Sequence, residues 1–452
     1  MTFYYSDNSF NLCKKNDILI TSIYMEFTIS FMPNEYNPIP LFDALEHLDS
    51  TRELQSIKIK SALPAEISIT HVLADYHHSC EFLKAYRGSA ETFKSYRREI
   101  ERLLQWCWFM HGKNLKDLRR TDMELFLECC QSPPKHWIGL KHVSRFIEND
   151  GLRTANPEWR PFIAAISKKA HRDGQLPTIK SFQLSQSALQ AIFAILSSFF
   201  NYLEQEEYTF GNPVAQIRQK SKFLRKHQGK KTIRRLSELQ WAYIIETAEA
   251  MAVENPGLHE RTLFIMNALF GMYLRISELA ASQRWIPQMG HFHKDIDNNW
   301  WFKTVGKGNK ERDVSVSNAM LDALKRYRTS LGFSSLPSPG EATPLIPKAK
   351  AKGPIEGTRH IRKIVQHCFD KTMEKLIADG FREDAEMLIP ATVHWLRHTG
   401  ISEDVKIRPR EHVRDDAGHS SSAITDQYID IELRARHASA KKKLIKLDEK
   451  IK

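Results

Sequence analysis

Residues 300–316 read WWFKTVGKGNKERDVSV, and this stretch decides the fold class. Two runs rich in aromatic and β-branched residues, Trp300–Val305 and Arg312–Val316, flank a short segment that contains Gly306 and Gly308. Two such runs joined by a glycine-containing turn predict an antiparallel β-hairpin. The chain on both sides of the hairpin is patterned for helices instead. We therefore predict a mainly α fold with a small antiparallel β-sheet.

Apolar residues recur at helical spacing before and after the hairpin, which is typical of amphipathic helices packed on a core. The expected helices cover residues 237–253, 260–279, 318–331, 357–378, 393–405 and 410–417. We expect these helices and the hairpin to form one domain, residues 236–435, followed by a C-terminal tail over residues 436–452.

The pattern before residue 213 is also helical. Phe93, Ile100 and Leu104 fall on one face of an expected helix, and Gly112 follows as its C-cap. Residues 66–213 therefore predict a compact all-α domain. Residues 1–65 lack clear periodicity and contain several prolines, which favours an N-terminal extension.

The 452-residue chain has 66 basic and 54 acidic side chains, and its formal net charge is +12. With 42% hydrophobic and 27% charged residues it is neither a disordered chain, a collagen-like fibre nor a polytopic membrane protein. The positive charge makes a polyanion, nucleic acid first, the expected partner. The apolar run Ile18–Met32 is too short to span a bilayer, so we expect no membrane association.

Much of the positive charge lies between the two expected domains, in a basic linker over residues 214–235. Nine basic residues and no acidic residue occur there between positions 218 and 235. They are Arg218, Lys220, Lys222, Arg225, Lys226, Lys230, Lys231, Arg234 and Arg235. A solvated tether can have this composition. The run is equally typical of a linker that crosses a phosphate backbone, where Lys and Arg gain free energy from counterion release.

Several chemistries are excluded by missing motifs. The six cysteines include no C-x-x-C pair, which indicates a reducing compartment and neither a zinc ribbon nor a disulfide framework. The sequence has no P-loop, no G-x-S-x-G elbow and no H-E-x-x-H motif. We therefore expect no cofactor, no metal site and a cytoplasmic location.

The remaining residues with chemical potential are cations, histidines and one tyrosine. Arg275 and Glu278 lie one helical turn apart, as do His394 and Arg397. Taken singly, a pair such as Arg275 and Glu278 is more often an ion pair on a helix surface, and a pair such as His394 and Arg397 is commoner by chance than by function. The adjacent His398 points elsewhere on a helix, and we interpret it as structural. His419 follows a glycine in an expected turn, and Tyr428 comes nine residues later.

Taken in order, these residues resemble the tyrosine recombinase (phage integrase) family, in particular its Xer-like members. The stretches that carry the resemblance are LFGMYLRISELA (269–280), VGKGNKERDVSV (305–316), HWLRHTGIS (394–402) and AGHSSSAITDQY (417–428). The resemblance covers residues 235–435. It extends more loosely to the preceding helical part, where TFKSYRREIERLLQWC (92–107) and FNYLEQEEYTFGNP (200–213) look like the family's core-binding domain.

The resemblance implies a role for each matching residue. Tyr428 would attack a DNA phosphate and become a 3′-phosphotyrosine. Arg275 and Arg397 would hold the non-bridging oxygens, and Glu278 would orient Arg275. Lys307 would protonate the leaving 5′-oxygen. His394 would assist proton transfer, and His419 would hydrogen-bond the phosphoryl group.

These residue types suit the chemistry. A phosphodiester is anionic, so the site must supply positive charge where the transition state gathers negative charge. Guanidinium groups match phosphate oxygens bidentately. A covalent phosphotyrosine preserves the energy of the phosphodiester, so strand joining requires neither ATP nor a metal.

The resemblance further implies a C-shaped clamp of two domains on double-stranded DNA. It implies a nucleoid-associated enzyme of a mobile element that acts as a homo-tetramer during synapsis and is a monomer or dimer when free. Two alternatives remain open, namely a type IB topoisomerase-like enzyme and an inactive DNA-binding protein of the same fold. The sequence departs from the family's pattern at Val413–Ala417, where two acidic residues precede Gly418.

Overall fold

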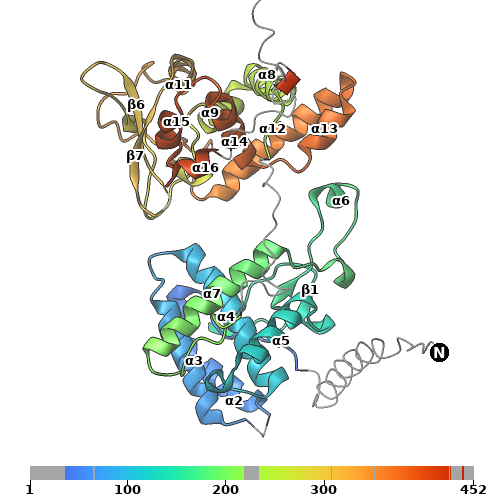
Figure 1. Cartoon of the computed structure of the whole chain (residues 1–452). Helices are drawn as coiled ribbons and strands as arrows, with labels where there is room; N and C mark the ends of the chain where they lie inside the picture. The colour runs from blue at the N-terminus through green and yellow to red at the C-terminus, as the bar shows by residue number, and fades with distance from the viewer. Residues whose placement is uncertain are drawn as a thin grey trace, which may run out of the picture. The chain divides into compact units, whose positions relative to one another are not determined.

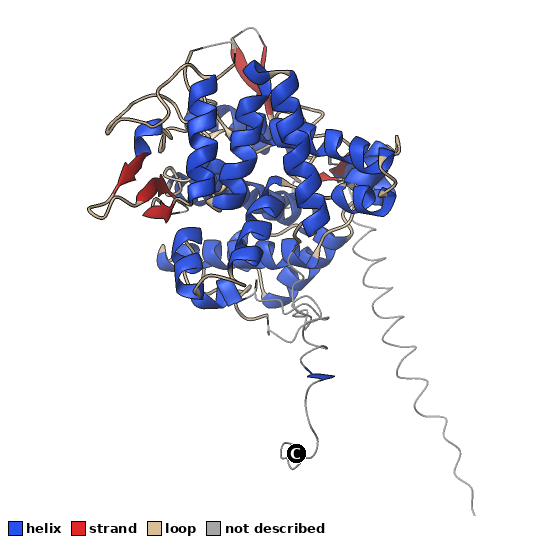
Figure 2. Cartoon of the chain, turned by 90° about the horizontal axis from the view of Figure 1, so that it is seen from above, coloured by secondary structure: helices blue, strands red, loops and turns tan. Residues whose placement is uncertain are grey.

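The computed structural model describes residues 36–64, 67–149, 151–217, 234–306, 308–349, 352–426, 428, 440 and 441. The chain divides into two compact units, Met1–Gln228 and Gly229–Lys452, and each has its own apolar core (Figure 1). Helices dominate both units, and the strands form small sheets (Figure 2). The predicted fold class is confirmed. No helix in the described ranges is both long and apolar enough to cross a membrane.

Within its described residues, the first unit has six α-helices. They are α2 (Arg52–Ala62), α3 (Ile69–Lys84), α4 (Ala90–Trp106), α5 (Arg120–Gln131), α6 (Lys168–Arg172) and α7 (Gln186–Gln205). Helices α3, α4 and α7 contact one another and bury Cys80, Leu104 and Phe199 between them. Gly112 follows a π-turn at the end of α4 in the left-handed conformation, as its predicted role of C-cap requires.

The first unit also contains strands that the sequence did not indicate. Strand β1 (Ile138–Gly139) pairs in parallel with β4 (Phe162–Ile163), and β2 (Phe146–Asn149) forms a hairpin with β3 (Leu152–Ala155). The prediction of an all-α domain is corrected here. Strands of two to four residues are too short to show the alternation by which strands are recognised.

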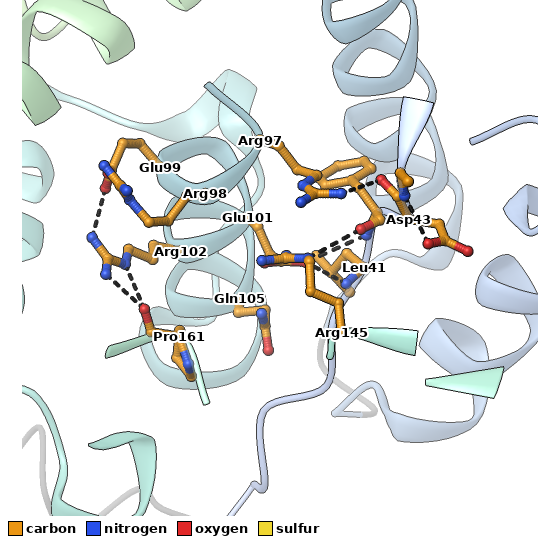
Figure 3. Close-up of polar contacts among 12 residues, drawn as sticks. Leu41, Asp43, Arg97, Arg98, Glu99, Glu101, Arg102, Gln105, Arg145 and Pro161 are labelled. Carbon is orange, nitrogen blue, oxygen red and sulfur yellow. Dashed lines mark hydrogen bonds and ion pairs between the residues drawn. The ribbon is translucent and has the colours of Figure 1, made fainter. Parts of the chain in front are cut away.

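Residues 36–64, predicted as part of an extension, belong to the core of the first unit. Leu41 and Phe42 are fully buried in it. The carboxylate of Glu101 on α4 accepts hydrogen bonds from the backbone N–H groups of both residues (Figure 3). The same carboxylate forms an ion pair with Arg145. Asp43 pairs with Arg153 on β3. The long-range polar contacts that fix this segment have no local sequence pattern, so periodicity could not reveal them.

The second unit surrounds the predicted hairpin with helices. Its helices are α8 (Glu238–Glu254), α9 (Pro256–Gly271), α10 (Ile276–Leu279), α11 (Asn318–Ser330), α12 (Thr358–Ala378), α13 (Arg382–Leu388), α14 (Val393–Asp404), α15 (Arg410–Ala417) and α16 (Ser422–Asp426). Strands β5 (Phe292–Lys294), β6 (Trp300–Val305) and β7 (Glu311–Ser315) form an antiparallel sheet in that order. The hairpin is confirmed, with Val305 opposite Glu311.

The helix predicted over residues 260–279 is interrupted. Tyr273 has a φ of 50°, in the left-handed region that a helix does not use. Helix α9 therefore ends at Gly271, and α10 starts after Arg275. Because of this break, Arg275 does not lie within a helix as predicted but is the N-cap residue of α10.

Gly400 lets α14 pack directly on α9. A Cβ atom at this position would lie 2.1 Å from the carbonyl oxygen of Phe270. We expect Gly400→Ala to destabilise the second unit by about 2 to 3 kcal/mol, because the two helices must separate. Urea unfolding measures this effect. Gly271→Ala is the matched control, since its Cβ would meet only the Met320 sulfur at 3.9 Å. Equal stability of the two variants would contradict the tight helix contact.

Candidate active site

Arg275 and Glu278 are joined at the start of α10. The backbone N–H of Arg275 donates to Glu278 Oε2 at 2.8 Å, and its Nη1 donates to Oε1 at 3.0 Å. The predicted pair is therefore present. Glu278 is fully buried. Burial raises its pKa, but the hydrogen bonds and charges of Arg312 and Arg275 outweigh this and hold the pKa of Glu278 below its ordinary value.

Arg312 is a third guanidinium group that the sequence reasoning did not single out. Its Nη1 and Nη2 donate to the two oxygens of Glu278 at 2.8 Å each, and its Nε donates to the carbonyl of Asp416 at 2.9 Å. Alternation along β7 was the available signal, because Arg312 lies two residues from the buried Val314 and therefore shares its face. This arginine connects the hairpin to α10 and α15.

The turn of the hairpin passes close to these charges. A Cβ atom on Gly306 would lie 3.0 Å from Arg312 Nη1, 3.2 Å from Arg275 Nη1 and 3.3 Å from Glu278 Oε1. Only glycine fits here without displacing them. The predicted acid Lys307 lies outside the described residues. Gly308 and Asn309, which follow it, both have positive φ angles that shape the turn.

Arg397 lies on α14 with 5% of its surface exposed. Its Nη1 donates to the carbonyl of Tyr273, and its Nη2 donates to that of Ala417 at 2.5 Å. Arg275 Nη2 donates to the next carbonyl, Gly418, at 3.0 Å. Burial and the neighbouring charge of Arg275 lower the pKa of Arg397 to about 9. The structure thus brings together two arginines that lie more than a hundred residues apart in the sequence.

Tyr428 lies beside these cations. It is 7% exposed and packs with Tyr273, Val413 and Ala417 in a small apolar cluster. Burial raises the pKa of its hydroxyl, while the charges of Arg397 and Arg275 lower it, and the net shift is upward. The other late tyrosine, Tyr327, is buried on α11 and stacks on the ring of Phe264 with centroids 4.5 Å apart.

Three histidines accompany Tyr428. The ring of His419 stacks on that of Tyr428 with centroids 5.6 Å apart, and its Nδ1 lies 2.9 Å from Thr425 Oγ1. His394 is exposed at its surface, and the partial desolvation of its ring together with the charge of Arg397 lowers its pKa. The ring of His398 lies 5.4 Å from that of Tyr428. The interpretation that His398 points away from the other candidates is therefore corrected, because the chain returns after α15 and packs Tyr428 against it.

The two acidic residues that depart from the family's pattern have separate environments. Asp415 is exposed and pairs with Arg414. Asp416 is buried and accepts hydrogen bonds from the backbone N–H and hydroxyl of Ser315 on β7 and from Arg408. Asp416 therefore fastens α15 to the sheet and adds no unpaired negative charge to the site.

A cavity of about 740 Å³ opens over these residues. Its lining includes Arg275, Lys310, Arg312 and His419 together with the acidic Glu311 and Asp415, whereas Arg397 and Tyr428 are not part of the lining. Three cationic side chains, those of Arg275, Lys310 and Arg312, line this hollow against two acidic ones, and such an excess of positive charge favours an anionic group. Among the described residues, no group of three or more His, Cys, Asp or Glu side chains could hold a metal ion.

The basic linker is described only at its end. Arg218, Lys220, Lys222, Arg225, Lys226, Lys230 and Lys231 lie outside the described residues. Arg235 Nη1 is 3.9 Å from Glu403 of α14. The role predicted for the linker therefore stays a prediction.

No family model matches the chain, and no curated protein matches it either. Solved structures do resemble it. A XerH site-specific recombinase in a post-cleavage complex with palindromic difH substrate is 14% identical, with 90% of this chain and 98% of that chain covered and a TM-score of 0.51. The Tn1549 transposon integrase in complex with a circular intermediate DNA is 13% identical, with 81% of this chain and 98% of that chain covered and a TM-score of 0.47. A lambda integrase dimer bound to a COC′ core site is 12% identical, with 89% of this chain and 90% of that chain covered and a TM-score of 0.45. The likeness to XerH shows that this chain has the fold of the tyrosine recombinases.

Proposed function

We propose that this protein is a site-specific DNA recombinase that cleaves and rejoins strands through a 3′-phosphotyrosine at Tyr428. The observation that carries the proposal is the convergence of Arg275 and Arg397, from two distant segments, beside that tyrosine. Their charges both act on the Tyr428 hydroxyl. A phenol near two guanidinium groups and an open cationic cavity is an arrangement suited to attack on a phosphodiester.

In the proposed reaction, the Tyr428 oxygen attacks the phosphorus, and the bond to the 5′-oxygen breaks. Arg275 and Arg397 neutralise the non-bridging oxygens as negative charge develops on them. Each guanidinium carries five N–H groups, and the bonds to described residues use only two in each side chain. The others are available to phosphate while the main-chain carbonyls keep the two side chains in place.

The remaining roles are those that the resemblance implies. Lys307 gives a proton to the leaving 5′-oxygen, His394 assists proton transfer, and His419 donates a hydrogen bond to the phosphoryl group. Glu278 fixes Arg275 through the contact at 3.0 Å. The substrate is double-stranded DNA at two sites of a mobile element, held in a homo-tetramer, and the basic linker follows the phosphate backbone between the two units.

A covalent trapping experiment tests this function. Duplexes are first selected from a random-sequence pool by binding to the full chain. They are then rebuilt with nicks at successive positions, so that the short 5′-hydroxyl fragment is lost after cleavage. We expect a protein–DNA adduct that survives denaturation, with the modified peptide containing Tyr428.

The alternatives predict different results. Tight binding to selected duplexes without any adduct at any nick position would indicate an inactive DNA-binding protein. Relaxation of a supercoiled plasmid that carries two selected sites, with no exchange between those sites, would indicate a topoisomerase-like enzyme.

A further inference from the structure

His398 has a ring nitrogen without a hydrogen-bond partner among the described residues, and its ring packs against that of the proposed nucleophile. Its ring lies against that of Tyr428, with centroids 5.4 Å apart and planes at 42°. Its Nδ1 is buried and has no hydrogen-bond partner among the described residues. A buried polar atom left unpaired loses its hydration without gaining a hydrogen bond, so it destabilises the folded protein. A catalytic role is one of the explanations for a buried polar atom of this kind.

The other two histidines near Tyr428 are less suited to receive its proton. The Nδ1 of His419 already lies 2.9 Å from Thr425 Oγ1. The ring of His394 is 6.4 Å from that of His398, on the side of the helix that carries Arg397 one turn later. Of the three, His398 is the one that combines a ring packed against that of Tyr428 with a buried ring nitrogen that has no partner among the described residues.

The charges around His398 favour its neutral form. Burial, then the neighbouring His394 and Arg397, lower the pKa of His398 to about 4. A neutral imidazole has one nitrogen with a free lone pair, so Nδ1 can accept a proton when Nε2 carries the hydrogen. Among the described residues, Arg397 and Arg275 act on the charge of Tyr428, and Arg312 acts on His419, whose ring stacks on that of Tyr428.

We propose that His398 Nδ1 is the general base that takes the proton of the Tyr428 hydroxyl during attack on DNA. This inference rests on the proposed function. The O–H bond of Tyr428 breaks as its oxygen bonds to phosphorus, and the proton moves to Nδ1. The 5′-oxygen leaves with a proton from a separate acid, so the imidazolium returns its own proton to Tyr428 when the strand is rejoined.

Bound DNA would strengthen this base. The charge of Arg397 disfavours the protonated imidazole in the free protein. A phosphodiester anion bound to Arg397 compensates that charge, so the pKa of His398 rises toward the pH at which the enzyme works. The base is therefore weakest without substrate and strongest when the phosphate is in place.

The test compares His398→Phe and His398→Asn with wild type on the selected, nicked duplex. We expect His398→Phe to slow single-turnover adduct formation by about 10²- to 10⁴-fold, the usual contribution of a general base. His398→Asn keeps an acceptor near the Nδ1 position but does not titrate, so its rate should lose the fall that wild type shows at acidic pH. The melting temperature and duplex binding of each variant are compared with those of wild type to verify that it is folded. His360→Phe, on the exposed face of α12, is the matched control.

A second substrate separates the base from the acid. In a 5′-bridging phosphorothiolate, sulfur leaves without needing a proton, so this substrate should rescue Lys307→Ala but not His398→Phe. A wild-type adduct together with a His398→Phe rate within threefold of it would overturn the inference and leave the proposed function standing. The inference would also be overturned if the phosphorothiolate substrate restored adduct formation equally in both variants. It would be overturned as well if the rate of His398→Asn still fell at acidic pH. A wild type that forms no adduct would remove the proposed function itself, and the role of His398 with it.

Discussion

Tyr428→Phe is expected to abolish the covalent protein–DNA adduct while leaving duplex binding unchanged. The substitution removes only the hydroxyl oxygen, and the ring keeps its place in the apolar cluster with Tyr273, Val413 and Ala417. Loss of a nucleophile typically lowers the rate by about 10⁴-fold or more. The adduct is measured on a denaturing gel, and binding is measured separately by a mobility shift.

Tyr327→Phe is the matched control for this result. Tyr327 is buried on α11, and its hydroxyl has no partner among the described residues. Removing that oxygen should change neither the adduct nor the melting temperature by much. An adduct that survives in Tyr428→Phe would assign the nucleophile to another residue and overturn the proposed mechanism.

Glu278→Gln is expected to have the second large effect, on both stability and activity. The carboxylate receives two hydrogen bonds from Arg312 and two from Arg275, and it is fully buried. An amide cannot balance two guanidinium charges, and breaking a buried ion pair on one side costs about 3 to 5 kcal/mol. Urea unfolding should show this loss. Adduct formation should fall as well, because Arg275 is no longer held in position.

The pH dependence gives an independent check on Glu278. Its pKa is below the ordinary value of 4.5 in the folded protein. Its contribution to stability is therefore fully present above that ordinary value and is lost as the pH falls through the lower, folded pKa. Glu278→Gln should remove this part of the acid sensitivity.

Glu311→Gln provides the comparison for Glu278→Gln on the same hairpin. Its side chain is 64% exposed and pairs with Lys303 at 3.2 Å. An exposed pair of this kind contributes about 0 to 1 kcal/mol, so the variant should unfold almost as wild type does. Equal stability of Glu278→Gln and Glu311→Gln would mean that the buried cluster does not hold the site together.

The fold of the second unit was largely predictable because its signals are local. The hairpin over 300–316 shows two β-rich runs and a glycine turn, and the helices after it follow apolar periodicity with clear ends. Local sequence patterns predicted neither the short strands of the first unit nor the packing of residues 36–64 into its core. There the chain is fixed by distant partners, such as Glu101 on the backbone of Leu41.

Most residues of the site could be predicted from the sequence, but the contacts that join them could not. Arg275, Arg397, His419 and Tyr428 do come together in space. Arg312 was missed because a guanidinium on a strand looks like any surface cation until its carboxylate partner is known. His398 was misjudged because its neighbour, Tyr428, lies thirty residues further along the chain. Their roles in the reaction remain predictions for the experiments above.

The carboxylate that Arg275 and Arg312 share has a consequence for ionic strength. Glu278 has no exposed surface, so mobile ions in the buffer screen its attraction to the two guanidinium groups much less than they screen exposed charges. Added salt should weaken the long-range encounter with a polyanion while the internal geometry of the cations stays intact. The protein should therefore regain full activity at once when a concentrated salt solution is diluted, without a slow refolding step.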